Sequence, residues 1–83
     1  MNTDQCIKNF CQNLRHLRKV YGMNQKEMAK ILGISVNKLS KMENCDPSVR
    51  IYAALLCRAC SYFHKTPDEM LYENWPEMLS ARR

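Results

Sequence analysis

The sequence has few of the residues that break helices and few of those that favour strands. Its 83 residues include only two glycines and three prolines, and β-branched side chains are sparse. This composition favours an all-helical chain over a sheet protein, whose strands and turns depend on these residue types. The apolar fraction of 46% is ordinary for a globular protein. We therefore expect a single domain with one core, near the lower size limit for independent folding.

Segments that would target the chain to a membrane or for secretion are also missing. No apolar run approaches the roughly 20 residues that a membrane-spanning helix needs. The opening stretch MNTDQCIKNF lacks the basic region and the apolar region of a secretory signal. We therefore expect a cytoplasmic protein that makes no use of a membrane.

Cysteine, in contrast, is well represented. The odd number and the missing secretion signal argue against a disulfide framework and favour buried free thiols. Cys57, Cys60 and His64 are spaced so that one helix could direct all three at a metal ion, which leaves a zinc site as an alternative. A redox-sensing thiol is a second alternative. Since buried thiols explain the pattern more simply, no metal and no cofactor are predicted. The five cysteines are Cys6, Cys11, Cys45, Cys57 and Cys60.

Charge is distributed unevenly along the chain. The net charge is +5, and the stretch from Lys8 to Lys41 carries eight basic residues against a single acid, Glu27. Half of the acids lie near the C-terminal end. Such asymmetry favours a polyanionic partner for the first half, although a solvated basic face would give the same pattern. The basic residues in question are Lys8, Arg15, Arg18, Lys19, Lys26, Lys30, Lys38 and Lys41.

Apolar residues that recur every three or four positions predict five helices and no strand. The fourth and fifth helices each start at a proline, Pro47 and Pro67, whose missing N–H is harmless at the first helical position. Residues 76–83 are expected to form a frayed tail. The expected helices cover about residues 4–21, 25–33, 36–44, 47–64 and 67–75.

The second and third helices lie in the stretch NQKEMAKILGISVNKLSKMEN, residues 24–44. Two short helices joined by a tight turn with a glycine are typical of the helix-turn-helix unit. Ala29 is small where the helices must cross closely, and Gly33 can adopt the left-handed conformation that ends the second helix. Ser35 is the expected N-cap of the third helix. The polar face of that helix would then protrude at a fixed tilt that suits a DNA major groove.

These features resemble the Cro-type, lambda-repressor-like helix-turn-helix domain of the xenobiotic-response-element class. The resemblance is carried by LRKVYGMNQKEMAKILGIS, LSKMEN and TPDEML and covers about residues 14–71. It implies a compact, all-α, five-helix domain over residues 1–83, with the helix-turn-helix at residues 25–44. It also implies a sequence-specific regulator of transcription that binds double-stranded DNA, usually as a repressor, with no enzymatic step, cofactor or small-molecule domain.

The resemblance further implies roles for individual residues. Base contacts fall at the start of the third helix and one turn later, at Val36, Asn37, Ser40 and Lys41. Phosphate contacts are expected at Asn24, Gln25, Lys26, Ser35, Lys38 and Asn44. Arg18 and Glu43 match a salt bridge that ties the first helix to the end of the third. Side-chain chemistry agrees, because Asn can pair with adenine, Lys can reach guanine, and Val can pack on a thymine methyl group.

Two features depart from the family pattern. A glycine and several further residues usually follow the Glu-Asn pair, whereas Cys45 and Asp46 stand there directly before Pro47. The loop before the fourth helix is therefore expected to be short and to offer few phosphate contacts. The fourth helix is expected to be about one turn longer than is usual in the family, which would alter the surface available for dimerisation.

A symmetric homodimer on DNA is expected through the fifth helix and the C-terminal tail. Apolar side chains are more numerous there than so small a core requires: Met70, Leu71, Tyr72, Trp75, Met78 and Leu79. The alternative function is a protein-interaction module on the same scaffold, such as an antitoxin or a regulator of another transcription factor. Lysines on the predicted recognition surface favour nucleic acid over that alternative.

Overall fold

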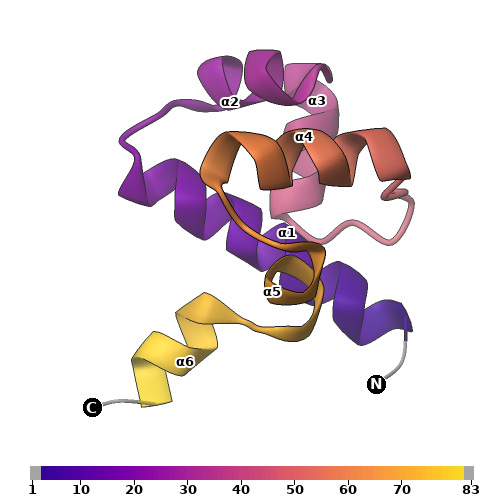
Figure 1. The fold of residues 1–83 in the computed structure, drawn as a ribbon. Helices are drawn as coiled ribbons and strands as arrows, with labels where there is room; N and C mark the ends of the chain where they lie inside the picture. The colour runs from indigo at the N-terminus through magenta and orange to yellow at the C-terminus, as the bar shows by residue number, and fades with distance from the viewer. Residues whose placement is uncertain (1–2, 82–83) are drawn as a thin grey trace.

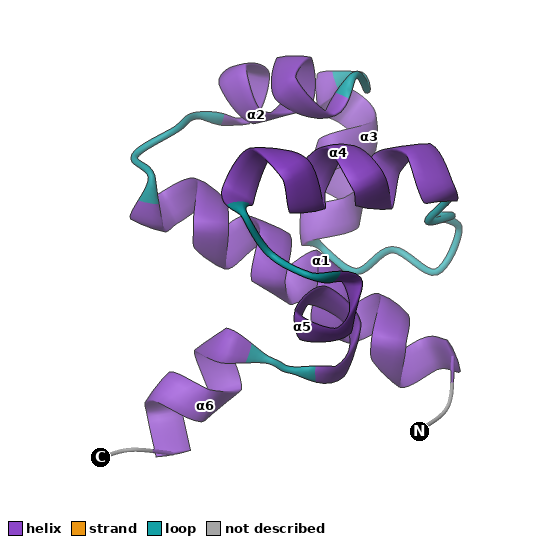
Figure 2. Cartoon of the chain, in the orientation of Figure 1, coloured by secondary structure: helices purple, strands orange, loops and turns teal. Residues whose placement is uncertain are grey.

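The computed structural model describes residues 3–81, and this part of the chain forms six α-helices (Figure 1). Turns and loops connect them, and no strand occurs between residues 3 and 81 (Figure 2). The helices are α1 (Thr3–Val20), α2 (Gln25–Leu32), α3 (Val36–Glu43), α4 (Ala53–Phe63), α5 (Pro67–Tyr72) and α6 (Trp75–Ala81). The predicted all-α class is confirmed. The predicted number of five helices is wrong by one.

α1 is the element on which the rest of the fold is assembled. α2 packs against α3 and α4, whereas α3, α5 and α6 each contact α1, so that α2 and the α5–α6 pair lie at opposite ends of the molecule (Figure 1). Burying a large apolar side chain stabilises a fold by about 1.5–3 kcal/mol, and a single cluster of such side chains fills the centre. Its members are Phe10, Cys11, Leu14, Leu17, Met28, Ala29, Leu32, Leu39, Met42, Val49, Leu55, Ala59, Phe63 and Met70.

A glycine, Gly22, terminates the turn that follows α1. Gly22 has the left-handed φ of +66°. Its N–H donates to the carbonyl of Lys19 at 3.1 Å, and the N–H of Met23 donates to the carbonyl of Arg18 at 3.0 Å. These two bonds satisfy carbonyls that the helix end would otherwise leave unpaired. The chain can therefore reverse direction within a few residues and enter α2.

The fourth helix begins later than the sequence predicts. α4 starts at Ala53, and residues 44–52 form a loop in place of the expected start at Pro47. Asp46 does not cap a helix, because its Oδ1 accepts from the N–H of Ser48 at 2.8 Å and from the Ser48 hydroxyl at 2.6 Å. Asp, Pro and Ser favour local turns as well as helix starts. The loop is therefore longer than predicted, and the fourth helix is shorter, with 11 residues.

A sixth helix occupies most of the segment that was predicted to be a frayed tail. α6 begins at Trp75, and its start is capped by Asn74, whose Oδ1 accepts from the N–H of Glu77 at 3.1 Å. Pro76 is the second residue of the helix, where it can be accommodated because the first-turn N–H groups have no partner inside a helix. The prediction of fraying is thus wrong for residues 76–81, and residues 82 and 83 lie outside the described part.

Two buried asparagines of α1 bind the backbone of the C-terminal helices, and we call Asn9 and Asn13 the asparagine clasp. Asn13 is completely buried. Its Nδ2 donates to the carbonyl oxygens of Met70 at 3.0 Å and Glu73 at 2.8 Å, and its Oδ1 accepts from the N–H of Trp75 at 2.9 Å. Asn9 donates to a further carbonyl of α5 at 2.9 Å. The clasp explains why α6 is docked on α1 in spite of its short length.

The helices between residues 3 and 81 include none that is both long enough and apolar enough to cross a membrane.

Candidate nucleic-acid interface

The turn between α2 and α3 fixes the direction of α3. Gly33 has a left-handed φ of +71° and donates its N–H to carbonyls of the last turn of α2, including that of Ala29. The N–H of Ile34 donates to the same Ala29 carbonyl at 3.0 Å. Ser35 then caps α3 by accepting from the N–H of Lys38 at 3.1 Å. Because every residue of the turn is held by a hydrogen bond or a cap, α3 has a defined tilt relative to α2.

The start of α2 is held by a reciprocal cap. Asn24 accepts from the N–H of Glu27 at 2.8 Å, and the Glu27 carboxylate accepts from the N–H of Asn24 at 3.1 Å. The positive end of a helix dipole favours anions such as phosphate. Gln25 is half-buried and Lys26 is exposed in this first turn, so both an amide and an ammonium group lie at the helix end. The Glu27 carboxylate partly offsets this positive charge.

α3 has one buried face and one polar face. Leu39 and Met42 have no exposed surface. On the other side, Val36, Asn37 and Lys41 are exposed, and Val36 is 41% exposed. Ser40 is half-buried between the two faces. The four residues that the sequence assigns to base contacts are therefore on or beside the accessible side of α3.

Lys38 is held to one side of this polar face. Its Nζ lies 3.3 Å from the Tyr52 hydroxyl and 4.4 Å from the centre of the Tyr52 ring. Such a cation–π contact contributes about 0.5–1 kcal/mol at an exposed site. Lys38 therefore connects α3 to the end of the loop over residues 44–52, and its ammonium group remains next to the polar face.

Three side chains connect α1, α2 and α3 behind the polar face. Arg18 donates from Nε to Oε2 of Glu43 at 2.7 Å and from Nη2 to Oε1 at 2.9 Å. Gln25 Nε2 donates to the same Oε1 at 3.3 Å. The hydrogen bond to the Glu43 carboxylate raises the pKa of the Arg18 guanidinium above its ordinary value, so Arg18 remains a cation. The sequence predicts the Arg18–Glu43 pair, but it does not reveal that Gln25 joins it.

α3 ends with a left-handed residue, as many helices do, but this residue is not a glycine. Asn44 is exposed at the C-cap, and Cys45 follows with a left-handed φ of +56°. The N–H of Cys45 donates to the Met42 carbonyl at 2.9 Å, and that of Asp46 donates to the Lys41 carbonyl at 3.0 Å. A cysteine thus occupies a left-handed position that glycine usually fills at helix ends, and the Asn44 side chain stays accessible.

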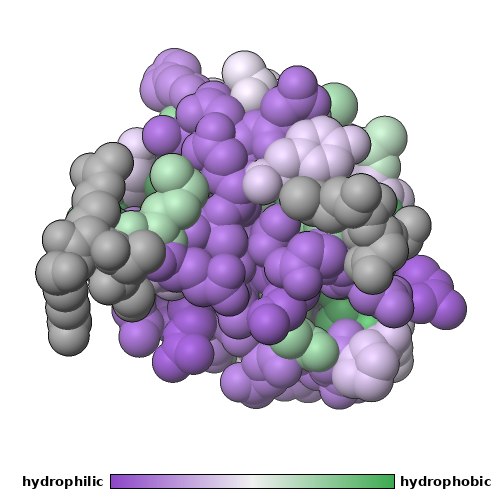
Figure 3. All heavy atoms as spheres, turned by 90° about the horizontal axis from the view of Figure 1, so that it is seen from below, coloured by the Kyte–Doolittle hydropathy of each residue, from purple (hydrophilic) through white to green (hydrophobic). Residues whose placement is uncertain are grey.

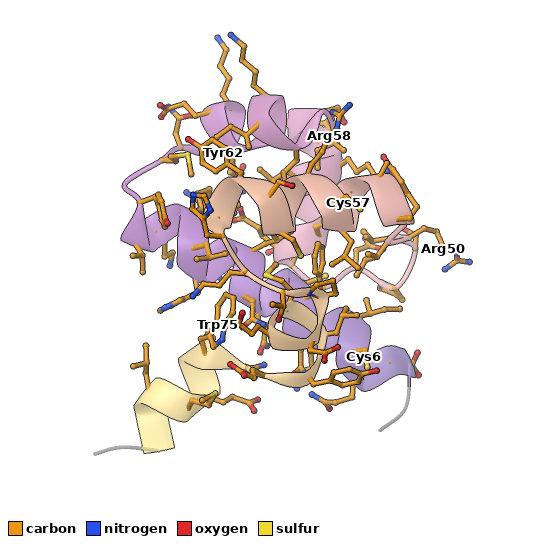
Figure 4. The ribbon with its side chains drawn as sticks, in the orientation of Figure 1. Cys6, Arg50, Cys57, Arg58, Tyr62 and Trp75 are labelled. Carbon is orange, nitrogen blue, oxygen red and sulfur yellow. The ribbon has the colours of Figure 1, made fainter. Side chains whose placement is uncertain are left out.

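Two arginines near this surface are absent from the sequence-based set of site residues. Arg50 lies in the loop over residues 44–52 and extends away from the body of the molecule (Figure 4). The sequence analysis places this segment in the fourth helix, so it does not predict a cation on an exposed loop. Arg58 of α4 reaches back to the turn and donates to the Leu32 carbonyl at 3.4 Å. A cation at the C-terminus of α2 interacts favourably with the helix dipole. No local pattern could have paired Arg58 with a carbonyl 26 positions earlier in the chain.

The cysteines do not gather into a metal site in the described part of the chain. Cys57 is exposed, Cys60 is half-buried, and His64 occupies the left-handed C-cap of α4. No three His, Cys, Asp or Glu side chains among residues 3–81 form a group that could hold a metal ion. The zinc alternative therefore has no support in the arrangement of these residues.

All five thiols are free, but they differ in environment. The expectation of buried thiols applies to Cys11, which is completely buried, and is wrong for the exposed Cys57. Burial raises the pKa of the Cys11 thiol to about 12, and the neighbouring Cys45 thiol contributes to the same shift. Cys11 is therefore protonated and unreactive at neutral pH.

The sequence was also compared with known proteins. The family model of the Cro/C1-type HTH DNA-binding domain matches residues 13–72, from the middle of α1 to the end of α5. No curated protein and no solved structure matches the chain significantly.

Proposed function

Because the chain belongs to the Cro/C1-type HTH DNA-binding domain family, we propose that it is a sequence-specific transcriptional repressor that inserts α3 into the major groove. The observation that carries the proposal is the polar face of α3. Asn37 and Lys41 are exposed on it, one turn of helix apart, with Leu39 and Met42 buried behind them. A side chain that reads bases must be accessible in this way, on a helix that its own packing holds still.

Base reading is assigned to four residues of α3. Asn37 can form a bidentate pair with adenine and Lys41 can donate to guanine, each with about 1–3 kcal/mol of discrimination against the wrong base. Val36 can pack on a thymine methyl group, and the Ser40 hydroxyl can serve as donor or acceptor. The exposure of Val36 supports this role, because an apolar side chain at this place would gain from leaving water.

Backbone binding is assigned to the residues that surround α3. The proposed contacts come from both ends of the helix-turn-helix and from the Ser35 turn, and Arg50 of the exposed loop is added to the set. The hydrogen bond from Gln25 to Glu43 supports the proposal, because it ties the start of α2 to the end of α3. The proposed phosphate-binding residues are Asn24, Gln25, Lys26, Ser35, Lys38, Asn44 and Arg50.

We further propose a homodimer on two half-sites about one helical turn apart, formed through α5 and α6. Tyr72, Met78 and Leu79 support this assignment, since they are 54%, 44% and 51% exposed. Met70 is buried in the core and is not available. Seen from below, the face of the molecule is mostly hydrophilic with small separate apolar patches (Figure 3). So small an apolar surface favours a dimer that forms on DNA rather than in free solution.

The test is selection from a randomised duplex pool at two salt concentrations, with wild type, Asn37→Ala and Lys41→Ala. We expect an enriched, roughly palindromic site for wild type, and a loss of preference at one base position per half-site for each variant. Lys26→Ala is the matched control, because losing a phosphate contact weakens binding to all sequences alike and lowers the salt dependence.

The alternative function, a protein-interaction module on this scaffold, predicts a different outcome. Wild type would then enrich no site, and its weak binding to DNA would disappear at the higher salt concentration. Both alanine variants would behave as wild type does, and the proposal of base reading by α3 would be wrong.

A further inference from the structure

α1 carries a row of basic side chains that the proposed recognition surface does not use. Lys8, Arg15 and Lys19 are exposed, and His16 is half-buried beside them. These residues line an open depression of about 840 Å³ between α1, the end of α3 and the start of α6. Asn44, which follows α3, forms part of the same lining. We call Lys8, Arg15 and Lys19 the α1 row.

The three cations lie on one side of the helix. Lys8 and Arg15 are seven residues apart, and Arg15 and Lys19 are four apart, which are the spacings that return a side chain to the same face. At a rise of about 1.5 Å per residue, the row extends for roughly 16 Å along α1. One strand of B-DNA carries a phosphate about every 3.4 Å along the helix axis. The row is thus long enough to face several consecutive phosphates.

Few carboxylates lie near the α1 row to neutralise its charge. Two acids line the depression, Glu43 and Glu77. Glu43 is buried and is already paired with Arg18, which is the one ion pair found between residues 3 and 81. Within the depression, Glu77 is therefore the one acid left against the three cations, and Asp4 lies one turn before Lys8 on the same side of α1. This excess of positive charge would attract an anionic partner.

We propose that the α1 row binds the phosphate backbone of DNA that flanks the sequence read by α3. The inference rests on the proposed function and extends it, since the row would lengthen the contacted DNA without adding base contacts. The link is Asn44, which belongs both to the proposed phosphate-binding set and to the lining of the depression. A strand that meets Asn44 can continue across the row without leaving the protein surface.

The shape of the depression favours an extended polyanion over a small ligand. A pocket for a free phosphate or a nucleotide would enclose it with buried polar groups. The cations here are instead spread along an exposed helix face. Arg15 can form a bidentate pair with a phosphate, and the lysines can serve as point charges.

The experiment combines a double variant with duplexes of two lengths. Wild type and Arg15→Gln/Lys19→Gln are titrated with a duplex that ends at the selected site and with one that carries about ten extra base pairs on each side. We expect wild type to bind the longer duplex more tightly and with a steeper dependence on salt. The variant should lose this gain, and its log–log salt slope should fall by about 0.9 for each lost phosphate contact.

The preference of the double variant for the selected site over a scrambled one should stay as in wild type, because the base-reading residues are intact. As a control, Lys30→Gln removes one exposed cation of α2 that does not line the depression. It should retain the gain from flanking DNA, whereas Arg15→Gln alone should lose part of it. Circular dichroism of each variant verifies that the helices are intact.

Three outcomes would overturn the inference. If the double variant gains as much from flanking DNA as wild type does, the row does not bind the backbone, while the proposed function stands. If inorganic phosphate alone, or a polyglutamate peptide, shifts the NMR signals of Lys8, Arg15 and Lys19 and flanking DNA gives no gain, the partner is a free anion or an acidic protein. If wild type selects no site at all, the proposed function fails and the inference fails with it.

Discussion

Arg18 of α1 donates two hydrogen bonds, of 2.7 and 2.9 Å, to the Glu43 carboxylate at the end of α3. The Glu43 side chain is only 4% exposed, and its oxygens accept these two bonds and a weaker one from Gln25. Bidentate, charge-assisted pairs of this kind are among the stronger polar interactions in proteins. α3 is therefore anchored at its C-terminal end by an ion pair, while its N-terminal end is held by the Ser35 cap.

Removing the cation of this pair should destabilise the fold strongly. Arg18→Gln leaves a buried carboxylate without its partner, and such changes cost about 3–5 kcal/mol. Urea unfolding should reveal the loss as a lower midpoint with an unchanged slope. Adding Glu43→Gln to the variant should recover part of the stability, because the charge that lacks a partner is then gone. If the double variant is no more stable than Arg18→Gln, the pair contributes through packing rather than through charge.

The two glycines allow a matched comparison of backbone strain. Gly22→Ala should cost about 1–2 kcal/mol, since a Cβ is unfavourable at left-handed φ and nothing else lies within 4 Å of it. Gly33→Ala should cost more. Its Cβ would collide with the Arg58 guanidinium, which would have to abandon its bond to the Leu32 carbonyl. Thermal unfolding of both variants measures the difference. Equal losses of stability in the two variants would mean that Arg58 moves aside at no cost and that its bond to Leu32 does not stabilise the turn.

Cys45 offers the opposite test, because it is a non-glycine residue in a glycine conformation. Cys45→Gly should raise the free energy of unfolding by about 1 kcal/mol through relief of left-handed strain. Cys45→Ala keeps the strain and serves as the control. Chemical denaturation of the two variants and of wild type measures their free energies of unfolding. A loss of stability in Cys45→Gly would show that the contact of Cys45 with Cys11 outweighs the strain.

The buried thiol of Cys11 predicts a specific dependence of stability on alkaline pH. In the folded state burial raises its pKa to about 12, whereas an exposed thiol ionises near 8.5. The unfolded chain therefore releases this proton first as the pH rises. The contribution of Cys11 is complete below about pH 8.5 and is lost toward pH 12, by at most about 1.4 kcal/mol per pH unit.

Unfolding of wild type and Cys11→Ala at pH 8 and pH 10 isolates this effect from other titrating groups. Stability should fall more steeply with pH in wild type. Thiol labelling gives a second measurement, in which Cys57 should react quickly and Cys11 only on unfolding. Parallel pH profiles for the two proteins would contradict the assignment.

The asparagine clasp should be essential for the C-terminal helices. Asn13→Leu leaves the carbonyls of Met70 and Glu73 and the N–H of Trp75 without their partner, and each unpaired buried group costs about 1–3 kcal/mol. We expect hydrogen exchange to accelerate first in α5 and α6, with α2 and α3 less affected. Asn44→Leu is a suitable control, because the Asn44 side chain is exposed. Uniform acceleration across the chain would show that the clasp supports the whole fold rather than its C-terminal end.

Local signals made the helix-turn-helix predictable. Asn24, Gly33 and Ser35 each act on backbone groups within a few residues, so their roles as cap or stop can be inferred from sequence alone. Asp46 shows the limit of such signals, because the same carboxylate that can cap a helix instead closes a turn with Ser48. A local pattern does not decide between two local hydrogen bonds of similar strength.

The interactions that the sequence concealed are those between distant positions. α6 lies where a frayed tail is expected from the sequence, and the contact of Asn13 with this region, more than 60 positions away, explains why a helix is held there. The hydrogen bonds from Gln25 to Glu43 and from Arg58 to the Leu32 carbonyl also join distant positions, so the sequence does not predict them. Residue type identifies a side chain that can donate, whereas its acceptor is determined by the packing of the helices.

Trp75 is the only tryptophan of the chain, and its backbone N–H is held by Asn13. It lies at the start of α6, in the lower half of the molecule as drawn in Figure 4, whereas α2 lies at the top. The indole is therefore an intrinsic fluorescent probe for the packing of α6 against α1, and it requires no added label. A change in its emission when an operator duplex is added would mean that an event at α3 is transmitted across α1. A constant emission would mean that the two ends of this small protein respond independently.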